Sequence, residues 1–229
     1  MNALFRLAIA LVTLLLLASC VGQLKEAPTQ QRMYLLTAES PARMTEKPLV
    51  TGPLSVRPML VSPGYATRHL IYRSGADRYE SDYYNMFLAR PERLINQIVR
   101  GSLVDAGLFE RVVQAGSVIE PAYVLESSLI ALYADFHKGS VAVLKADFFL
   151  LQRQALDMVP VWESRLSIEE PLDDESADEV VAGMNRALTR MLEELTQGLA
   201  QVLPELKPAS TERSYRDSNF GSQEVNGGQ

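Results

Sequence analysis

The chain is poor in the side chains that most often build metal and catalytic sites. Its 229 residues include one cysteine, Cys20, and two histidines, His69 and His137. A single cysteine cannot form an intramolecular disulfide, and zinc or histidine-based catalysis needs partners at suitable spacing. Neither histidine has such partners, so each is interpreted as a surface or half-buried side chain. We therefore expect no metal site, no catalytic residue and no cofactor.

Motifs of two common enzyme classes are also missing. The sequence contains neither the G-x-S-x-G elbow of many hydrolases nor the G-x-x-x-x-G-K-[ST] phosphate loop. A non-enzyme is therefore expected. A hydrolase remains the alternative, which would be supported if replacing one polar residue abolished ester turnover in a folded variant.

The chain has no excess of basic residues. It carries 22 Lys and Arg against 28 Asp and Glu, a formal net charge of −6. Nucleic acid is therefore not expected as a partner, because its phosphates must be neutralised by cationic side chains.

Long apolar runs are absent except near the start of the chain. Leu7 to Leu17 is apolar, follows Arg6 and leads into the small residues Ala18 and Ser19 before Cys20. This pattern resembles the lipobox of bacterial lipoproteins, in which the cysteine is acylated, for example by palmitate. It predicts a signal peptide over 1–19 and lipidation at Cys20, with an uncleaved membrane anchor as the alternative.

The rest of the chain divides by composition. Residues 20–32 are polar and predict a lipidated tether, residues 33–203 carry the periodic apolar patterns of a folded domain, and residues 204–229 predict a disordered tail. Because Val21 and not aspartate follows the cysteine, similarity to sorted lipoproteins favours the outer membrane, with the domain facing the periplasm.

Period-two patterns predict the strands. Short strands are expected at 33–37, at 53–61 with an interruption at Pro58 that favours an edge or bulged position, at 69–73 and 78–84, and at 109–113. Three longer strands, 123–136, 141–152 and 159–168, predict an antiparallel meander. In the first of these, alternation places Tyr123, Leu129, Ala131 and Tyr133 on one face.

Two helices are expected. One begins at Pro91 and ends at Gly107, and the other follows Ser176 and ends near Leu203. Ser176 and Glu179 form a capping box, in which Ser176 accepts the Glu179 amide and Glu179 reaches back. The fold class is α/β, with α+β as the alternative: a single domain whose mixed, largely antiparallel sheet is packed by two amphipathic helices.

Tyrosine and arginine concentrate between residues 65 and 84. Both are enriched at protein–protein hot spots, so this segment is a candidate surface for binding a partner, although several rings would serve equally well to cover the sheet. The residues predicted to bind the partner are Arg68, Tyr72, Arg73, Tyr79, Tyr83 and Tyr84.

These segments resemble the PqiC-like ABC-type transport auxiliary lipoprotein family. The matching pieces are Tyr65 with Arg68, Ile71-Tyr72-Arg73, Tyr83-Tyr84, and Gly107-Leu108-Phe109 with Val112. Phe87 stands where many members carry tryptophan, so a ring contact is kept while the indole hydrogen bond is lost.

The resemblance implies an accessory of an intermembrane lipid transport system. Its partner would be an MCE-domain protein that spans the periplasm and belongs to an ABC-type transporter. The lipoprotein would dock this protein at the outer membrane. The alternative is an envelope lipoprotein that activates or assembles another cell-envelope machine. Assembly into a homo-oligomer and direct lipid binding are left open by the sequence.

Overall fold

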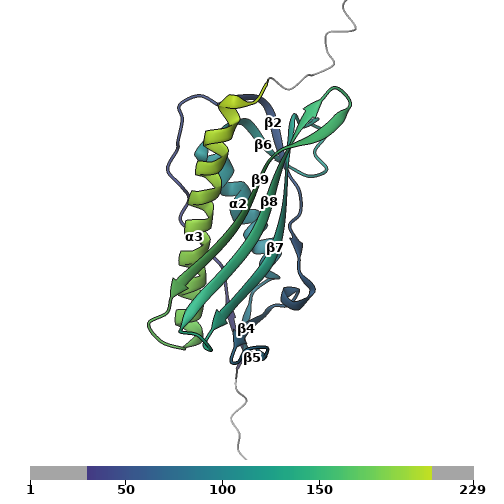
Figure 1. The fold of residues 1–229 in the computed structure, drawn as a ribbon. Coiled ribbons are helices and arrows are strands. Elements are labelled where there is room, and N and C mark those ends of the chain that lie inside the picture. Colours follow the sequence, from purple (N-terminus) through teal and green to yellow (C-terminus); the bar gives the residue numbers. More distant parts are fainter. Residues whose placement is uncertain (1–29, 208–229) are drawn as a thin grey trace, which may run out of the picture. The chain divides into compact units, whose positions relative to one another are not determined.

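The computed structural model describes residues 30–207 (Figure 1). The predicted signal peptide, Cys20, most of the predicted tether and residues 208–229 lie outside the described residues. Residues 33–207 belong to one compact unit, whose fold is described below.

The sheet is mixed, as predicted. Its strands are β1 (Arg32–Tyr34), β2 (Val50–Val56), β3 (Leu60–Val61), β4 (His69–Arg73), β5 (Tyr79–Phe87), β6 (Phe109–Gln114), β7 (Tyr123–Asp135), β8 (Val141–Gln154) and β9 (Asp157–Pro171). The order along one path is β1-β5-β4-β7-β2-β6, and β8 and β9 extend from β7. The predicted meander is confirmed, because β7, β8 and β9 pair antiparallel in sequence.

Strand β7 organises the sheet. One of its edges pairs with β8 along the whole strand, from Tyr123 opposite Gln152 to Asp135 opposite Val141. Its other edge pairs in turn with β2, β3 and β4, all parallel to it. A single long strand therefore connects the β4–β5 hairpin to the meander.

The two predicted helices are confirmed as α2 (Pro91–Ala106) and α3 (Ala177–Val202). Pro91 occupies the first turn of α2, and Gly107 ends it in the left-handed conformation (φ 69°), which glycine adopts without strain. The 3-10 turns η1 (Pro63–Tyr65) and η2 (Leu203–Glu205) complete the regular elements of residues 30–207. Because η2 is regular and Leu206 packs against the core, the start predicted for the disordered tail at residue 204 is wrong. No helix among residues 30–207 is both long enough and apolar enough to cross a bilayer.

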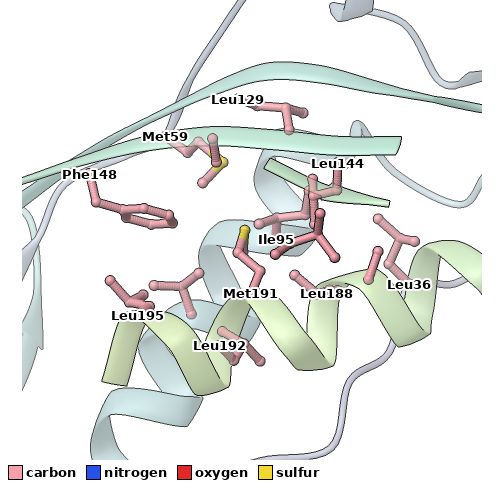
Figure 2. Packing of buried hydrophobic residues seen from close by; sticks show 14 of the residues in the cluster. Leu36, Met59, Ile95, Leu129, Leu144, Phe148, Leu188, Met191, Leu192 and Leu195 are labelled. Atoms are coloured by element: carbon pink, nitrogen blue, oxygen red, sulfur yellow. The ribbon is translucent and has the colours of Figure 1, made fainter. Parts of the chain in front are cut away.

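Both helices pack on the same face of the sheet. Figure 2 shows side chains of α2 and α3, such as Ile95, Leu188 and Met191, facing Leu144 and Phe148 of β8. All five are at most 1% exposed. The predicted apolar stripe of α3 therefore forms the main core. The opposite face of the sheet, here called the outer face, carries a second and smaller cluster.

A β-bulge overturns the face predicted for the end of β7. Leu129 pairs with Ala146 and Ala131 pairs with Lys145, so Ile130 is an extra residue. An extra residue reverses the alternation of the side chains that follow it. Tyr123 and Leu129 lie in the main core, as predicted, but Ala131 and Tyr133 lie in the cluster on the outer face.

The strand predicted over 53–61, with an edge or bulged position at Pro58, divides into β2 and β3, and the edge alternative is wrong for β2. β2 lies between β7 and β6, inside the sheet. Pro58 falls in the gap between β2 and β3, where the Arg57 N–H still donates to the Leu125 carbonyl. Pro53, which lacks an N–H, follows a register shift at Gly52 (φ 96°), so the bulge accommodates it.

Candidate functional site

The candidate site is built on an irregularity in β5. His69 of β4 pairs with Met86, whereas Ile71 pairs with Ser81, so residues 82–85 of β5 stand opposite Leu70 alone. The excess residues form a bulge that presents Tyr83 and Tyr84 away from regular pairing. Bulges of this kind redirect side chains and are enriched beside functional sites.

Asp82 holds this bulge with both carboxylate oxygens. Its Oδ1 accepts the backbone N–H groups of Tyr84 (2.8 Å) and Asn85 (3.0 Å). Its Oδ2 accepts the Tyr72 hydroxyl and the Asn85 side-chain amide, both at 2.7 Å. Four donors on one carboxylate fix the backbone on both sides of Tyr83.

The ionisation of this group follows from its partners. Burial opposes the charge on Asp82, but the hydrogen bonds from Tyr72, from the Asn85 side chain and from the two backbone amides outweigh it and lower the pKa of the carboxyl. Burial, followed by the bond to Asp82, raises the pKa of the Tyr72 hydroxyl. At neutral pH the pair is therefore a carboxylate with a protonated phenol.

Two further contacts connect the bulge to the core. The His69 ring lies 2.7 Å from the Asp82 carbonyl oxygen through its Nδ1. The Tyr34 hydroxyl reaches both Asn85 Oδ1 (3.3 Å) and Asp178 Oδ1 (2.8 Å), which lies in the first turn of α3. The bulge is therefore braced against β4 and against the start of the long helix.

The two tyrosines on the bulge are exposed. Their rings meet edge to face with centroids 5.2 Å apart, and 67% of Tyr83 and 46% of Tyr84 is accessible to solvent. Rigid aromatic rings on a braced backbone lose little conformational entropy on binding, which makes them effective anchors for a protein partner.

The structure divides the six residues predicted to bind a partner into two groups. Arg68 donates to the Phe87 carbonyl, Tyr72 donates to Asp82, and Arg73 pairs with Asp135 at 3.0 Å. These three side chains hold the hairpin together. Tyr79, Tyr83 and Tyr84 are the exposed members, and we call these three the tyrosine surface.

Several residues that the sequence analysis overlooked support this region. Asp82 and Asn85 brace the bulge, and Asp135 receives Arg73 together with the N–H groups of His137 and Lys138. Asp82 lies inside the strand predicted over 78–84 and Asn85 lies one residue beyond it, and short polar side chains disfavour regular pairing in a strand. That spacing was the available signal for a bulge.

Nothing in the described part of the chain gathers three or more His, Cys, Asp or Glu side chains in a way that could hold a metal ion. His69 contacts a backbone carbonyl, and His137 donates its backbone N–H to Asp135. Cys20, the predicted lipidation site, lies outside the described residues. The geometry is that of a braced protein surface.

Comparison with solved structures supports the fold. A crystallised Xanthomonas campestris protein of the DUF330 family is 16% identical, with a TM-score of 0.66 over 76% of this chain and 97% of its own. A crystallised uncharacterised protein is 13% identical, with a TM-score of 0.54 over 75% of this chain and 97% of its own.

No curated protein is similar enough to this chain to count as a relative. A family model does match, over residues 34–196, and its description is the ABC-type transport auxiliary lipoprotein component. The matched range is well over half of the chain and runs from Tyr34, through the β5 bulge, to Thr196 in α3. The chain therefore belongs to the ABC-type transport auxiliary lipoprotein family.

Proposed function

We propose that this protein is an outer-membrane lipoprotein that serves as the docking component of an ABC/MCE-type intermembrane lipid transport system. Lipid on Cys20 holds it at the membrane, and the tyrosine surface contacts an MCE-domain protein that spans the periplasm. The transporter's ATPase supplies the energy, so the lipoprotein itself needs no catalytic group. Membership of the transport auxiliary family supports this assignment.

The observation that carries the proposal is the bracing of Tyr83 and Tyr84. A tyrosine that only covered a sheet would be largely buried, yet Tyr83 is 67% exposed on a bulge fixed by four donors to Asp82. Exposed, preorganised tyrosines are typical of protein-binding surfaces. Arg68, Tyr72 and Arg73 contribute by positioning the hairpin.

Photo-crosslinking tests the proposal. A crosslinking amino acid at Tyr83 is activated in intact cells, and the adduct is purified in detergent and identified by mass spectrometry. The control probe replaces Leu156, which is 76% exposed at the turn between β8 and β9. Capture of an MCE-domain protein from position 83 and not from 156 is the expected result.

Two other results would contradict the proposal. Capture of a cell-wall enzyme or a barrel protein at position 83 would assign the lipoprotein to a different envelope machine. Equal capture of the MCE-domain protein from positions 83 and 156 would show that the tyrosine surface has no special part in docking.

A further inference from the structure

A pocket opens on the outer face of the sheet, apart from Tyr83 and Tyr84. Its volume is about 380 Å³, within the range of small-molecule sites. Residues from η1, β4 and β5 line it: Gly64, Tyr65, Ile71, Tyr79, Glu80 and Ser81. The helices pack on the other face, so no helix of the described chain covers this pocket.

Two tyrosine rings, Tyr65 and Tyr79, line the pocket, and a third ring, Tyr133, contacts both of them. Tyr133 stacks on Tyr65 with ring centroids 6.1 Å apart and meets Tyr79 edge to face at 5.5 Å. Tyr133 is 8% exposed, whereas Tyr79 is 46% exposed. The Ile130 bulge places Tyr133 on this face, so the packing that holds the two outer rings depends on an interruption of β7.

The pocket also has hydroxyl groups next to its aromatic rings. Burial, followed by the neighbouring Tyr79 and Tyr133, raises the pKa of Tyr65 to about 12. Burial likewise raises the pKa of Tyr133. The phenols therefore remain protonated at neutral pH and can both donate and accept hydrogen bonds. The exposed hydroxyl of Ser81 adds a further donor and acceptor beside them.

Charges near the pocket are compensated. Arg73 pairs with Asp135 at 3.0 Å, and Arg78 lies 3.6 Å from Glu80. Neither a phosphate nor an ammonium group would meet an uncompensated opposite charge. The pocket therefore suits an uncharged ligand with an apolar face and a hydroxyl-rich edge.

We propose that this pocket binds a neutral pyranose ring of an oligosaccharide. A pyranose has an apolar face of C–H groups, which are attracted to the electron-rich face of a tyrosine ring, and equatorial hydroxyls around its edge. Tyr79 supplies the exposed ring, Ile71 the apolar floor, and Tyr65 and Ser81 the polar partners. The Tyr65 hydroxyl already bonds the Tyr79 side chain but keeps further hydrogen-bonding capacity, which an acyl chain would not use.

Binding is tested with the full-length lipoprotein in a zwitterionic detergent, because sugar-headed detergents would compete. The probes are chitotetraose, cellotetraose and maltotetraose, three uncharged oligosaccharides. Saturation-transfer NMR identifies which probe protons contact the protein, and calorimetry gives the affinity. We expect ring C–H protons of at least one probe to receive saturation.

Three variants test whether the sugar binds in this pocket. Tyr79→Ala removes the exposed ring and is expected to weaken binding about tenfold. Ser81→Trp fills the cavity from an exposed position without removing a ring, so it provides a second test if Tyr79→Ala is unstable. Tyr83→Ala is the matched control, because it removes an exposed tyrosine of the same strand outside the pocket.

Two results would overturn the inference: no saturation transfer from the protein to any of the probes, or equal affinity in Tyr79→Ala and the unaltered protein. Tyr79 belongs both to the pocket and to the tyrosine surface, so a docked partner would cover it, but the sugar is tested on the purified lipoprotein without a partner. Failure here would leave crosslinking at Tyr83 unaffected, and failure of the crosslink would leave the pocket unaffected.

Discussion

Asp82 makes more hydrogen bonds within the bulge around Tyr83 than any tyrosine there does. It accepts four hydrogen bonds, and these bonds lower the pKa of its carboxyl despite partial burial. A carboxyl with a folded-state pKa below its unfolded value of about 3.9 stabilises the fold fully above that value. Its contribution is lost as the pH falls through the folded-state pKa.

Asp82→Asn is therefore expected to lower the free energy of unfolding at pH 7 by about 1–2 kcal/mol, because charge-assisted hydrogen bonds become neutral ones. The variant should also lose less stability than the unaltered protein between pH 5 and about pH 3. Urea unfolding at several pH values measures both effects. Asp77→Asn, in the exposed turn of the same hairpin, is the control, and an equal effect there would contradict the assignment.

Two glycines in helices have opposite surroundings. A Cβ at Gly198 would lie 2.8 Å from Cζ2 of Trp162, whereas a Cβ at Gly101 would meet no atom within 4 Å. Gly198 therefore lets α3 approach the indole of β9 closely. Gly101 only weakens α2, because glycine is more flexible than alanine in the unfolded chain.

Gly198→Ala should destabilise the protein by about 1–3 kcal/mol through overpacking. Gly101→Ala should stabilise it by about 0.5–1 kcal/mol. Thermal unfolding compares the two, and tryptophan fluorescence should change only in Gly198→Ala because Trp162 is the single tryptophan. A stable Gly198→Ala variant with unchanged fluorescence would show that α3 and β9 are less closely packed than described.

The start of α3 corrects the predicted capping box in one detail. Ser176 accepts the Glu179 N–H at 3.2 Å, as expected. Glu179 does not return the bond to Ser176. Its carboxylate binds Arg186 at 2.8 Å, and Asp174 accepts the Ser176 N–H at 2.7 Å. Arg186 competes for Glu179 from two turns along the helix, which the local sequence pattern does not reveal.

Ser176→Ala should consequently cost about 1 kcal/mol of stability, the usual value of a serine N-cap. Ser140→Ala is the matched control, because its hydroxyl makes a single long bond of 3.5 Å to Glu175. Urea unfolding should show a lower midpoint for Ser176→Ala alone. Equal midpoints for the two variants would mean that the Asp174 bond to the Ser176 N–H is enough to stabilise the start of α3 without the Ser176 hydroxyl.

Among the helices and strands, the sequence predicts the features that depend on local hydrophobic periodicity and on residues that begin or end an element. Pro91, Gly107 and Ser176 mark the helix ends, and alternation marks the long strands. What it does not predict are the bulges at Gly52, Ile130 and residues 82–85, because each depends on the register of a neighbouring strand. The candidate surfaces depend on two of these bulges. The tyrosine content therefore located the region between residues 65 and 84. The roles of Asp82 and Tyr133 follow only from the strand pairing of β5 and β7.

The whole molecule is asymmetric across its sheet. Within residues 30–207, helices α2 and α3 pack on one face with the main core, and the other face carries the small cluster that includes Tyr133 and Tyr65. β7 contributes to both faces. Leu125 and Leu129 belong to the main core, as does Leu132 beyond the Ile130 bulge, whereas Tyr133 lies on the outer face. The outer face and the β5 bulge are thus available for contact, while the helical layer stabilises the fold. This division fits the docking role proposed above.

The last turn of the described chain closes the main core at its end. Gln152 is 2% exposed, and its side-chain amide donates to the Lys207 carbonyl at 2.6 Å and to the Tyr123 hydroxyl at 3.3 Å. Leu206 packs against the same core. The four residues 204–207 therefore contribute more to stability than their position after α3 suggests.

A chain that ends at Leu203 should be less stable than one that ends at Lys207 by about 1–3 kcal/mol, because a buried amide donor loses its partner. Urea unfolding of the two truncated chains measures the difference. Gln152→Met removes the donor and keeps a side chain of similar length, so it should reduce the difference between the two chains. If the difference stays the same in Gln152→Met, the stability contributed by residues 204–207 comes from Leu206 packing, and the Gln152–Lys207 bond is not its source.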